Sequence, residues 1–290
     1  DREVINTSTG APVSIGTGGV LKRYDYVSTN AGTSLPRSVV GTDSYLYFID
    51  DNLNKICSYG ENEGLNYLSD REGLYSYMGN VDLTVGNSLY SPKTKEILFS
   101  LTDESIIYNE YTKSFIGFSD TTFDMGIYNN GYSYVFKNTL PSGDWYISGA
   151  TLGTGSYGGY GVDHLDSTVY SSVLDLIINP ARQISTRLDT IELSTEVSLA
   201  GVNDPDETFT SLRVRNNYQD TGVISLLANT NITRRFRTWR FNQLRDVLDT
   251  TNTGRIVDNY FRLTLSYDNT SNKKLAINDV QSSVGIINIR

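Results

Sequence analysis

The chain has 290 residues, a formal net charge of −9, and 21 Tyr and 10 Phe but only 1 Cys. The acidic balance argues against a general electrostatic affinity for nucleic acid or an anionic membrane, and no apolar run approaches the ~20 residues of a membrane-spanning helix. A single cysteine excludes an intrachain disulfide. A composition rich in Tyr and Gly and poor in helix formers predicts β structure, because aromatic rings suit a pleated, half-buried surface.

The negative charge is concentrated in the first half of the chain. Residues 1–150 contain 18 Asp and Glu against 10 Lys and Arg, whereas residues 151–290 contain 15 against 14. The chain begins at Asp1 without an initiator Met. From this start we expect a piece of a larger polypeptide.

The N-terminal residues predict an arm followed by a hairpin. Residues 1–37 are polar and Gly-rich and predict an extended arm with a first strand at Val20–Val27. Two runs of β-forming residues, Tyr45–Ile49 and Lys55–Tyr59, flank the turn-forming cluster Asp50–Asn54. This pattern is typical of an antiparallel hairpin.

The segment Lys95–Asp120 predicts a meander of three strands. Three short runs rich in β-branched and aromatic residues alternate there with polar clusters, and none has a 3.6-residue period. A further hairpin follows around Asn130–Gly131, since both residues readily take positive φ. Trp145–Ser148 then predicts one more strand.

Strand-turn-strand units therefore recur along the first half of the chain. Their spacing is roughly the 40–50 residues of a four-stranded propeller blade. We expect β-propeller-type blades in residues 38–165. The strands are too few to close a propeller, so we expect the missing blades to come from elsewhere in the parent polypeptide.

The pattern changes in the second half. Longer strands are predicted there, and we interpret residues 166–290 as an antiparallel β-sandwich or platform domain. The whole chain is thus predicted to be all-β. The longer strands are expected at Val169–Ile178, Ile184–Val197, Ser211–Val214, Gly222–Leu227, Arg234–Phe241, Tyr260–Tyr267 and Leu275–Ile289.

Two motifs resemble catalytic or cofactor sites but lack the required context. Gly153–Gly158 has the spacing of a dinucleotide fingerprint, with Asp175 downstream, but the following residues are strand-like and provide no helix N-terminus for a pyrophosphate. His164 is the only histidine, and no Gly-x-Ser-x-Gly elbow accompanies it. A flexible loop and a solvated histidine are the favoured interpretations.

Acidic clusters are better explained by turns than by chemistry. Asp50–Asn52 and Asp204–Glu207 lack the calcium-binding helix-loop-helix pattern, and Asp103–Glu104 lies in a predicted turn. A glycosidase pair depends on a carboxylate separation that sequence does not give. We predict no catalytic, cofactor-binding or metal-binding residue, and no enzyme.

The most unusual run is Thr233–Phe241, where arginines alternate with aromatic residues. Arg and Trp are enriched at interface hot spots, so we predict a subunit interface formed by Arg234, Arg235, Arg237, Trp239 and Arg240. A strand with internal salt bridges is an alternative. Single-stranded nucleic acid is a third, which the acidic net charge disfavours.

Several short patterns occur in a fixed order along the chain: Val20–Val27, Tyr47–Asp50, Glu96–Ser100, Ile107–Glu110, Ser114–Phe115 and Arg235–Arg240. Taken together, they resemble the tail nozzle (muzzle) proteins of short-tailed phages, especially the crAss-like phages.

The resemblance implies a structural virion component of the phage tail with a β-propeller and β-rich domains. Copies would form a ring, typically a hexamer, through whose lumen DNA is ejected without specific binding. Its partners would be the N-terminal remainder of the polypeptide and neighbouring tail hub and fibre proteins, with no membrane insertion by this chain. Because nozzle proteins are much larger, the chain would be a C-terminal fragment. No cofactor and no catalytic residue transfer from this family.

A second hypothesis is a carbohydrate-binding or glycan-cleaving β-propeller. The Tyr- and Gly-rich loop Gly155–Gly161 motivates it. Against it, an autonomous glycan enzyme is expected to contain a complete propeller, and this chain does not.

Overall fold

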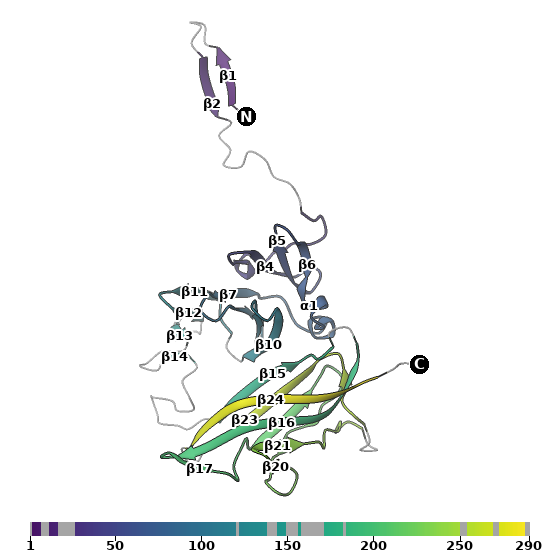
Figure 1. Cartoon of the computed structure of the whole chain (residues 1–290). Helices are drawn as coiled ribbons and strands as arrows, with labels where there is room; N and C mark the ends of the chain where they lie inside the picture. The colour runs from purple at the N-terminus through teal and green to yellow at the C-terminus, as the bar shows by residue number, and fades with distance from the viewer. Residues whose placement is uncertain are drawn as a thin grey trace. The chain divides into compact units, whose positions relative to one another are not determined.

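The computed structural model describes residues 27–119, 122–137, 171–181, 184–249, 254–268 and 273–287, together with the backbone of four strands at 2–6, 12–16, 144–148 and 156–157. Within these ranges nearly all regular structure is antiparallel β-sheet, as the composition predicts (Figure 1). Residues 1–31 and 32–290 form two separate compact units. In the first unit, β1 (Arg2–Asn6) and β2 (Pro12–Gly16) pair as an antiparallel hairpin.

The second unit begins with a short 3₁₀ helix, η1 (Pro36–Ser38), and a four-stranded sheet in the order β3-β4-β5-β6. The predicted hairpin is confirmed, and Asn54 in its turn has a φ of 52°, which Asn tolerates. Two single-turn helices follow the sheet. These elements are β3 (Val40–Gly41), β4 (Tyr45–Asp50), β5 (Lys55–Gly60), β6 (Gly64–Tyr67), α1 (Leu68–Arg71) and α2 (Tyr75–Met78).

The predicted meander is confirmed as part of an eight-stranded sheet in the order β19-β18-β23-β15-β10-β9-β8-β7. Four consecutive strands from the first half of the chain thus join four from the second half. The strands are β7 (Asn87–Ser91), β8 (Glu96–Ser100), β9 (Ser105–Asn109), β10 (Ser114–Ser119), β15 (Ser172–Ile178), β18 (Ser211–Arg215), β19 (Ile224–Ser225) and β23 (Phe261–Tyr267).

A third sheet has the order β11-β12-β13-β14. The predicted hairpin at Asn130–Gly131 is confirmed, with φ values of 50° and 85° at its two loop residues. The sheet packs on β7 through a small core that includes Leu89, Phe123 and Val135. Its strands are β11 (Met125–Asn129), β12 (Tyr132–Lys137), β13 (Asp144–Ser148) and β14 (Ser156–Tyr157), the last pair being parallel.

The second half of the chain adds a six-stranded sheet built on β16, which pairs with β24 along one edge and with β22, β21 and β17 along the other. Buried and half-buried residues alternate strictly in β23, so one face of this strand meets the core. Side chains from β16 and β21 pack with those from β18 and β23 in one core, as in a two-layer sandwich. The strands are β16 (Thr186–Leu199), β17 (Val202–Asp204), β20 (Thr233–Arg235), β21 (Thr238–Phe241), β22 (Val257–Asp258) and β24 (Lys274–Ile286).

Two predictions need revision. Separate propeller blades are not confirmed, because β7–β10 continue through the pairing of Gly117 with Leu176 into strands of the second half. The single strand predicted at Arg234–Phe241 is wrong, since the chain reverses at Phe236–Arg237 and forms the hairpin β20–β21. The division into domains at residues 37 and 165 stays a prediction.

The two halves of the second unit meet at Arg262, on the face of β23 opposite the sandwich core. Its side chain is 14% exposed and forms ion pairs with Glu104, at 2.6 Å, and with Asp175. The Nε atom of Arg262 donates to Asp175 Oδ2 at 2.8 Å, and Thr264 donates to the other carboxylate oxygen. One cation therefore joins the β8–β9 turn to β15 and β23.

Aromatic side chains surround this cation. The guanidinium lies 4.1 Å from the ring centre of Phe118, and the Tyr77 hydroxyl donates to Glu104 at 3.0 Å. Tyr77 packs edge-on against Phe118 and Tyr260. Tyr260 belongs to the core of the first half, whereas its neighbour Phe261 belongs to the sandwich core. The two hydrophobic cores thus meet at adjacent residues, at the start of β23.

Replacing Arg262 with Met should destabilise the protein by about 3 kcal/mol, because it leaves two largely buried carboxylates without their cation. Adding Glu104→Gln and Asp175→Asn to that variant should recover part of the loss. Urea denaturation measures both effects. As a control, Arg240→Met removes an ion pair whose side chains are 60% and 32% exposed and should change stability by less than ~0.5 kcal/mol. Equal losses in the two Met variants would contradict the role given to Arg262.

Gly117→Ala should destabilise the protein by roughly 1–3 kcal/mol. A Cβ atom at this position would lie 2.4 Å from the Asp175 carbonyl oxygen, so β10 and β15 would have to separate. Gly41→Ala is the matched control, because nothing lies within 4 Å of the place that a Cβ atom would take there. Thermal unfolding of both variants tests the close approach, and an unchanged melting temperature for Gly117→Ala would refute it.

Candidate functional site

The arginine-rich run forms a hairpin at one edge of the six-stranded sheet. Residue pairs Thr233 with Arg240 and Arg235 with Thr238 are in register, which leaves a two-residue loop of Phe236 and Arg237. Both loop residues have positive φ, 50° and 69°. The outer strand β20 pairs with β21, which in turn pairs with β16. The short strands of the hairpin are therefore supported, through β21, by the long strand β16.

Trp239 is part of the sandwich core. It is 1% exposed and packs in the same cluster as Phe241, its neighbour on the same face of β21. The indole Nε1 is buried without a hydrogen-bond partner among the described residues. The prediction that Trp239 offers surface to a second subunit is therefore corrected: alternation along β21 turns this side chain inward.

Two of the predicted arginines are tied to their own chain. The Arg234 guanidinium lies 5.5 Å from the ring centre of Trp239, and its Nη1 donates to the Pro205 carbonyl oxygen. Arg240 lies opposite Glu192 on β16, with Nε 3.4 Å from Oε1. Arg240 therefore agrees with the alternative interpretation of this run, a strand with salt bridges inside its own chain.

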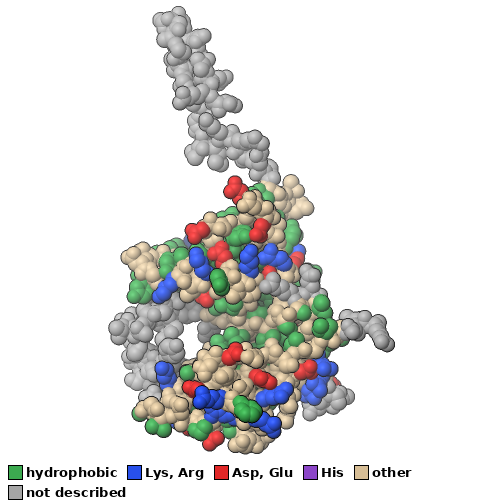
Figure 2. Space-filling model, viewed as in Figure 1, with side chains coloured by type: hydrophobic (Ala, Val, Ile, Leu, Met, Phe, Trp, Pro, Cys, Tyr) green, Lys and Arg blue, Asp and Glu red, His purple; other side chains and the backbone are tan. Residues whose placement is uncertain are grey.

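The remaining arginines, Arg235 and Arg237, are exposed, and neither forms an ion pair within the described part of the chain. Phe236 between them is 100% exposed. Hollows of about 520 and 370 Å³ lie beside the hairpin, and carboxylates such as Glu192 and Glu196 line them together with the arginines. Acidic and basic side chains are also intermingled on the face shown in Figure 2. This mixture is unlike the continuous basic track that nucleic acid requires.

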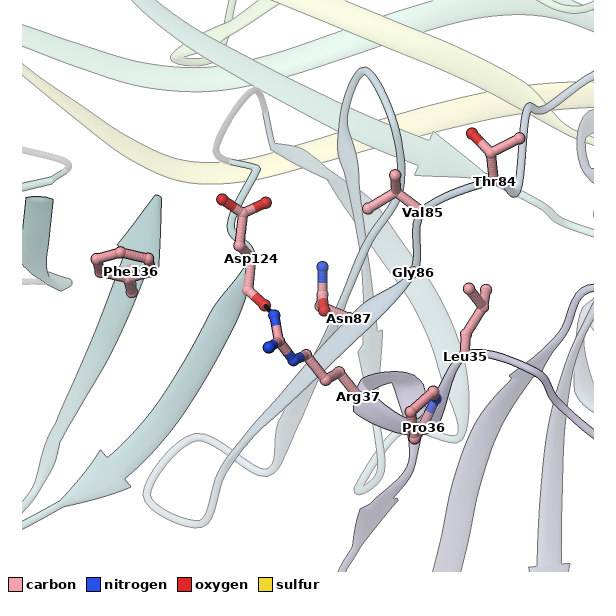
Figure 3. Close-up of a pocket in the computed structure, with 9 residues that line it drawn as sticks. All are labelled: Leu35, Pro36, Arg37, Thr84, Val85, Gly86, Asn87, Asp124 and Phe136. Carbon is pink, nitrogen blue, oxygen red and sulfur yellow. Dashed lines mark hydrogen bonds between the residues drawn. The ribbon is translucent and has the colours of Figure 1, made fainter. Parts of the chain in front are cut away.

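A larger groove, of about 780 Å³, lies in the first half of the second unit (Figure 3). The lining is partly apolar, and Arg37 reaches into it to donate from Nη1 to the Asp124 carbonyl oxygen at 3.2 Å. The Asn87 amide, which also lines the groove, donates to the Phe123 carbonyl oxygen at 2.9 Å. The groove is lined by Leu35, Pro36, Arg37, Thr84, Val85, Gly86, Asn87, Asp124 and Phe136.

Gly86 shapes this groove. A Cβ atom there would lie 2.9 Å from Leu35 Cδ1 and 3.0 Å from Ile49 Cδ1. The glycine thus allows the segment before β7 to lie against the 3₁₀ helix η1 and strand β4. No motif in the sequence indicated the groove, since its lining residues come from four separate segments.

The acidic residues weighed in the sequence have structural partners. Asp175 binds Arg262 and Thr264. Asp50 accepts bonds from the backbone amides of Gly32, Asn52 and Leu53. Lys273 bridges Asp204 and Glu207. These carboxylates therefore support turns and strand ends.

Other candidates lie outside the described residues or are buried. His164 is not described, and of Gly153–Gly158 only the backbone of β14 is. Burial raises the pKa of the Cys57 thiol to about 12, so this cysteine remains a protonated, apolar filler. Among the described residues, no helix is long and apolar enough to cross a membrane, and no three His, Cys, Asp or Glu residues gather as a metal site.

Comparisons with known proteins agree on one family. Residues 1–139 match the family model described as Crassvirus muzzle protein, and residues 164–246 match the Crassvirus muzzle protein C-terminal domain. The chain is also similar to the muzzle protein of Bacteroides phage crAss001, with 24% identity over 282 residues. That alignment covers 93% of this chain and 20% of the relative, so the chain spans about a fifth of the length of this curated relative.

Trp239→Ala should destabilise the protein by about 3–5 kcal/mol, because it empties part of the sandwich core. Arg235→Ala, on the adjacent strand but exposed, should stay within ~0.5 kcal/mol of the original protein. Urea denaturation monitored by circular dichroism compares the two. A small effect of Trp239→Ala would show that the indole lies at a surface, as the sequence first suggested.

Proposed function

We propose, since this chain belongs to the crassvirus muzzle protein family, that it forms part of the wall of a ring-shaped tail nozzle through which phage DNA is ejected. The family is one of structural phage proteins. The nozzle ring, its place in the tail and the passage of DNA are our proposal. The proposal includes no catalytic role.

The observation that carries this proposal is the exposed hairpin tip. Arg235, Phe236 and Arg237 lie at the tip of a hairpin on a supported sheet edge. Phe236 is fully exposed, and the two arginines have no ion-pair partner in the described chain. Arg and aromatic residues that remain free in one copy are typical of a protein interface. An interface between two different patches of identical copies closes into a ring when the rotation between the copies allows it. The expected copy number is six.

The charge of the chain supports passage of DNA without binding. The net charge is −9, and residues 1–150 carry most of the excess of Asp and Glu. A channel wall with this charge would repel phosphate groups and keep the duplex from adhering. A channel surface lined mainly by Lys and Arg would contradict this part of the proposal.

The remaining polypeptide is expected to complete the architecture. The sheets β3–β6 and β11–β14 each have four strands, the number in a propeller blade. We propose that segments of the longer muzzle polypeptide supply further blades and that tail hub and fibre proteins dock on the assembled ring.

Mass spectrometry of purified phage particles tests this function. We expect peptides from this chain at a stoichiometry of a few copies per particle, in constant ratio to other tail proteins. Native mass measurement of the full muzzle polypeptide should then give a closed oligomer. Absence of the peptides from intact particles would refute a virion role, and a monomer at micromolar concentration would refute the ring.

A further inference from the structure

The tip of the β20–β21 hairpin contains residues that its backbone geometry disfavours. A two-residue loop with positive φ at both positions is normally occupied by Asn and Gly, because other L-residues are strained there. The same chain follows this rule in the β11–β12 hairpin, where Asn130 and Gly131 have φ values of 50° and 85°. In the β16–β17 hairpin, the loop is Ala200 and Gly201, with φ values of 49° and 84°, so the second position is again Gly. At the arginine hairpin, Phe236 and Arg237 take nearly the same conformation, with φ of 50° and 69°.

The exposure of Phe236 is a second cost in the isolated chain. Its side chain is 100% exposed, so the whole ring faces water. A strained backbone and an exposed apolar ring at one position point to a functional contact, since neither contributes to the fold of the single chain. The flanking Arg235 and Arg237 add two cations that lack ion-pair partners in the described chain.

We infer that Phe236 is the anchor of this tip and that it inserts into the Leu35–Phe136 groove of a second copy, with Arg235 and Arg237 at the rim. This inference deepens the proposed function, on which it rests, by naming the two patches that meet. The partner is thus another copy of the same chain.

The groove fits an aromatic anchor in size and lining. Its volume is about 780 Å³. Leu35 and Val85 lie on one side of the bridge between Arg37 and Asp124, and Phe136 lies on the other (Figure 3). Val85 is 43% exposed, so an apolar surface is open to a visiting ring. An aromatic side chain entering between these groups would lose its contact with water and could pack on Phe136.

Charge favours the same pairing. The charged residues that line the groove, Arg37 and Asp124, balance each other, but residues 32–137 as a whole, the half that carries the groove, contain 14 Asp and Glu against 7 Lys and Arg. The hairpin Thr233–Phe241 contains four Arg and no acidic residue. The opposite charges of the two regions steer two copies together, and the like charges of two hairpins disfavour a contact between them.

The two patches lie on different parts of the chain. The hairpin belongs to the sandwich of the second half, whereas the groove is formed by η1, the start of β7 and the β11–β12 hairpin. Among the described residues, β20 and β21 make no extensive contact with any of those elements in the same chain. A contact between different patches of two copies is heterologous, which is the type that builds rings.

The test replaces the tip by the loop that its geometry prefers. The double variant Phe236→Asn, Arg237→Gly in the full muzzle polypeptide should raise the melting temperature of the unassembled chain, because it relieves strain and exposure there. The same variant should weaken self-association at least ~10-fold in sedimentation, as expected when an interface anchor is removed. Tyr111→Asn is the matched control, since this turn residue is also 87% exposed; it should leave self-association unchanged.

The groove is tested separately with Val85→Arg, which should weaken self-association to a similar extent. Combining it with the tip variant should add little, because both remove one contact. Unchanged self-association in the tip variant or in Val85→Arg would overturn the inference while the ring remained. Absence of any self-association in the unaltered protein would instead refute the proposed function.

Discussion

The structure depends on one buried cation. Arg262 holds Glu104 from the first half of the chain and Asp175 from the second, and it covers the ring of Phe118. Burial lowers the pKa of Arg262, but the hydrogen bond to Asp175 and the charges of Asp175 and Glu104 outweigh it and raise the pKa above its ordinary value. The guanidinium therefore stays charged and pairs with both carboxylates. Loss of Arg262 would leave two largely buried carboxylates without their cation, so the cluster fixes the elements that carry it.

This cluster matters because little backbone pairing connects the two halves. Within the eight-stranded sheet, β10 and β15 are joined in register at Gly117 and Leu176. Side chains around Arg262 and the adjacent core residues Tyr260 and Phe261 also connect the two halves. The groove of one half and the arginine hairpin of the other are thereby carried on one compact unit. A wall element that must repeat around a ring needs such fixed spacing between the surfaces that meet.

Local signals in the sequence predicted much of the fold. Turn chemistry located the hairpins at Asp50–Asn54 and Asn130–Gly131, and runs of β-forming residues located the meander. The β20–β21 hairpin was missed because Phe236 and Arg237 give no turn signal. The same error placed Trp239 at a surface, although alternation with Phe241 turns it into the core.

Turn residues and runs of β-forming residues do not predict contacts between residues that are far apart in the sequence. Along the chain, 71 positions separate Glu104 from Asp175, and 87 separate Asp175 from Arg262. Asp175 was considered only as part of a nucleotide-binding pattern. The groove of Figure 3 likewise draws on four segments. Of the candidate interface, sequence identified Arg235 and Arg237 but not Phe236, whose importance follows from its exposure and φ together.

Cryo-electron microscopy of the nozzle in intact particles would show whether this chain is a repeating wall element whose copies meet through different patches. We expect a closed ring in which the β20–β21 tip of each copy is buried against the first half of its neighbour. A ring in which Phe236 faces solvent or the channel, or a particle in which this chain does not repeat around an axis, would contradict it.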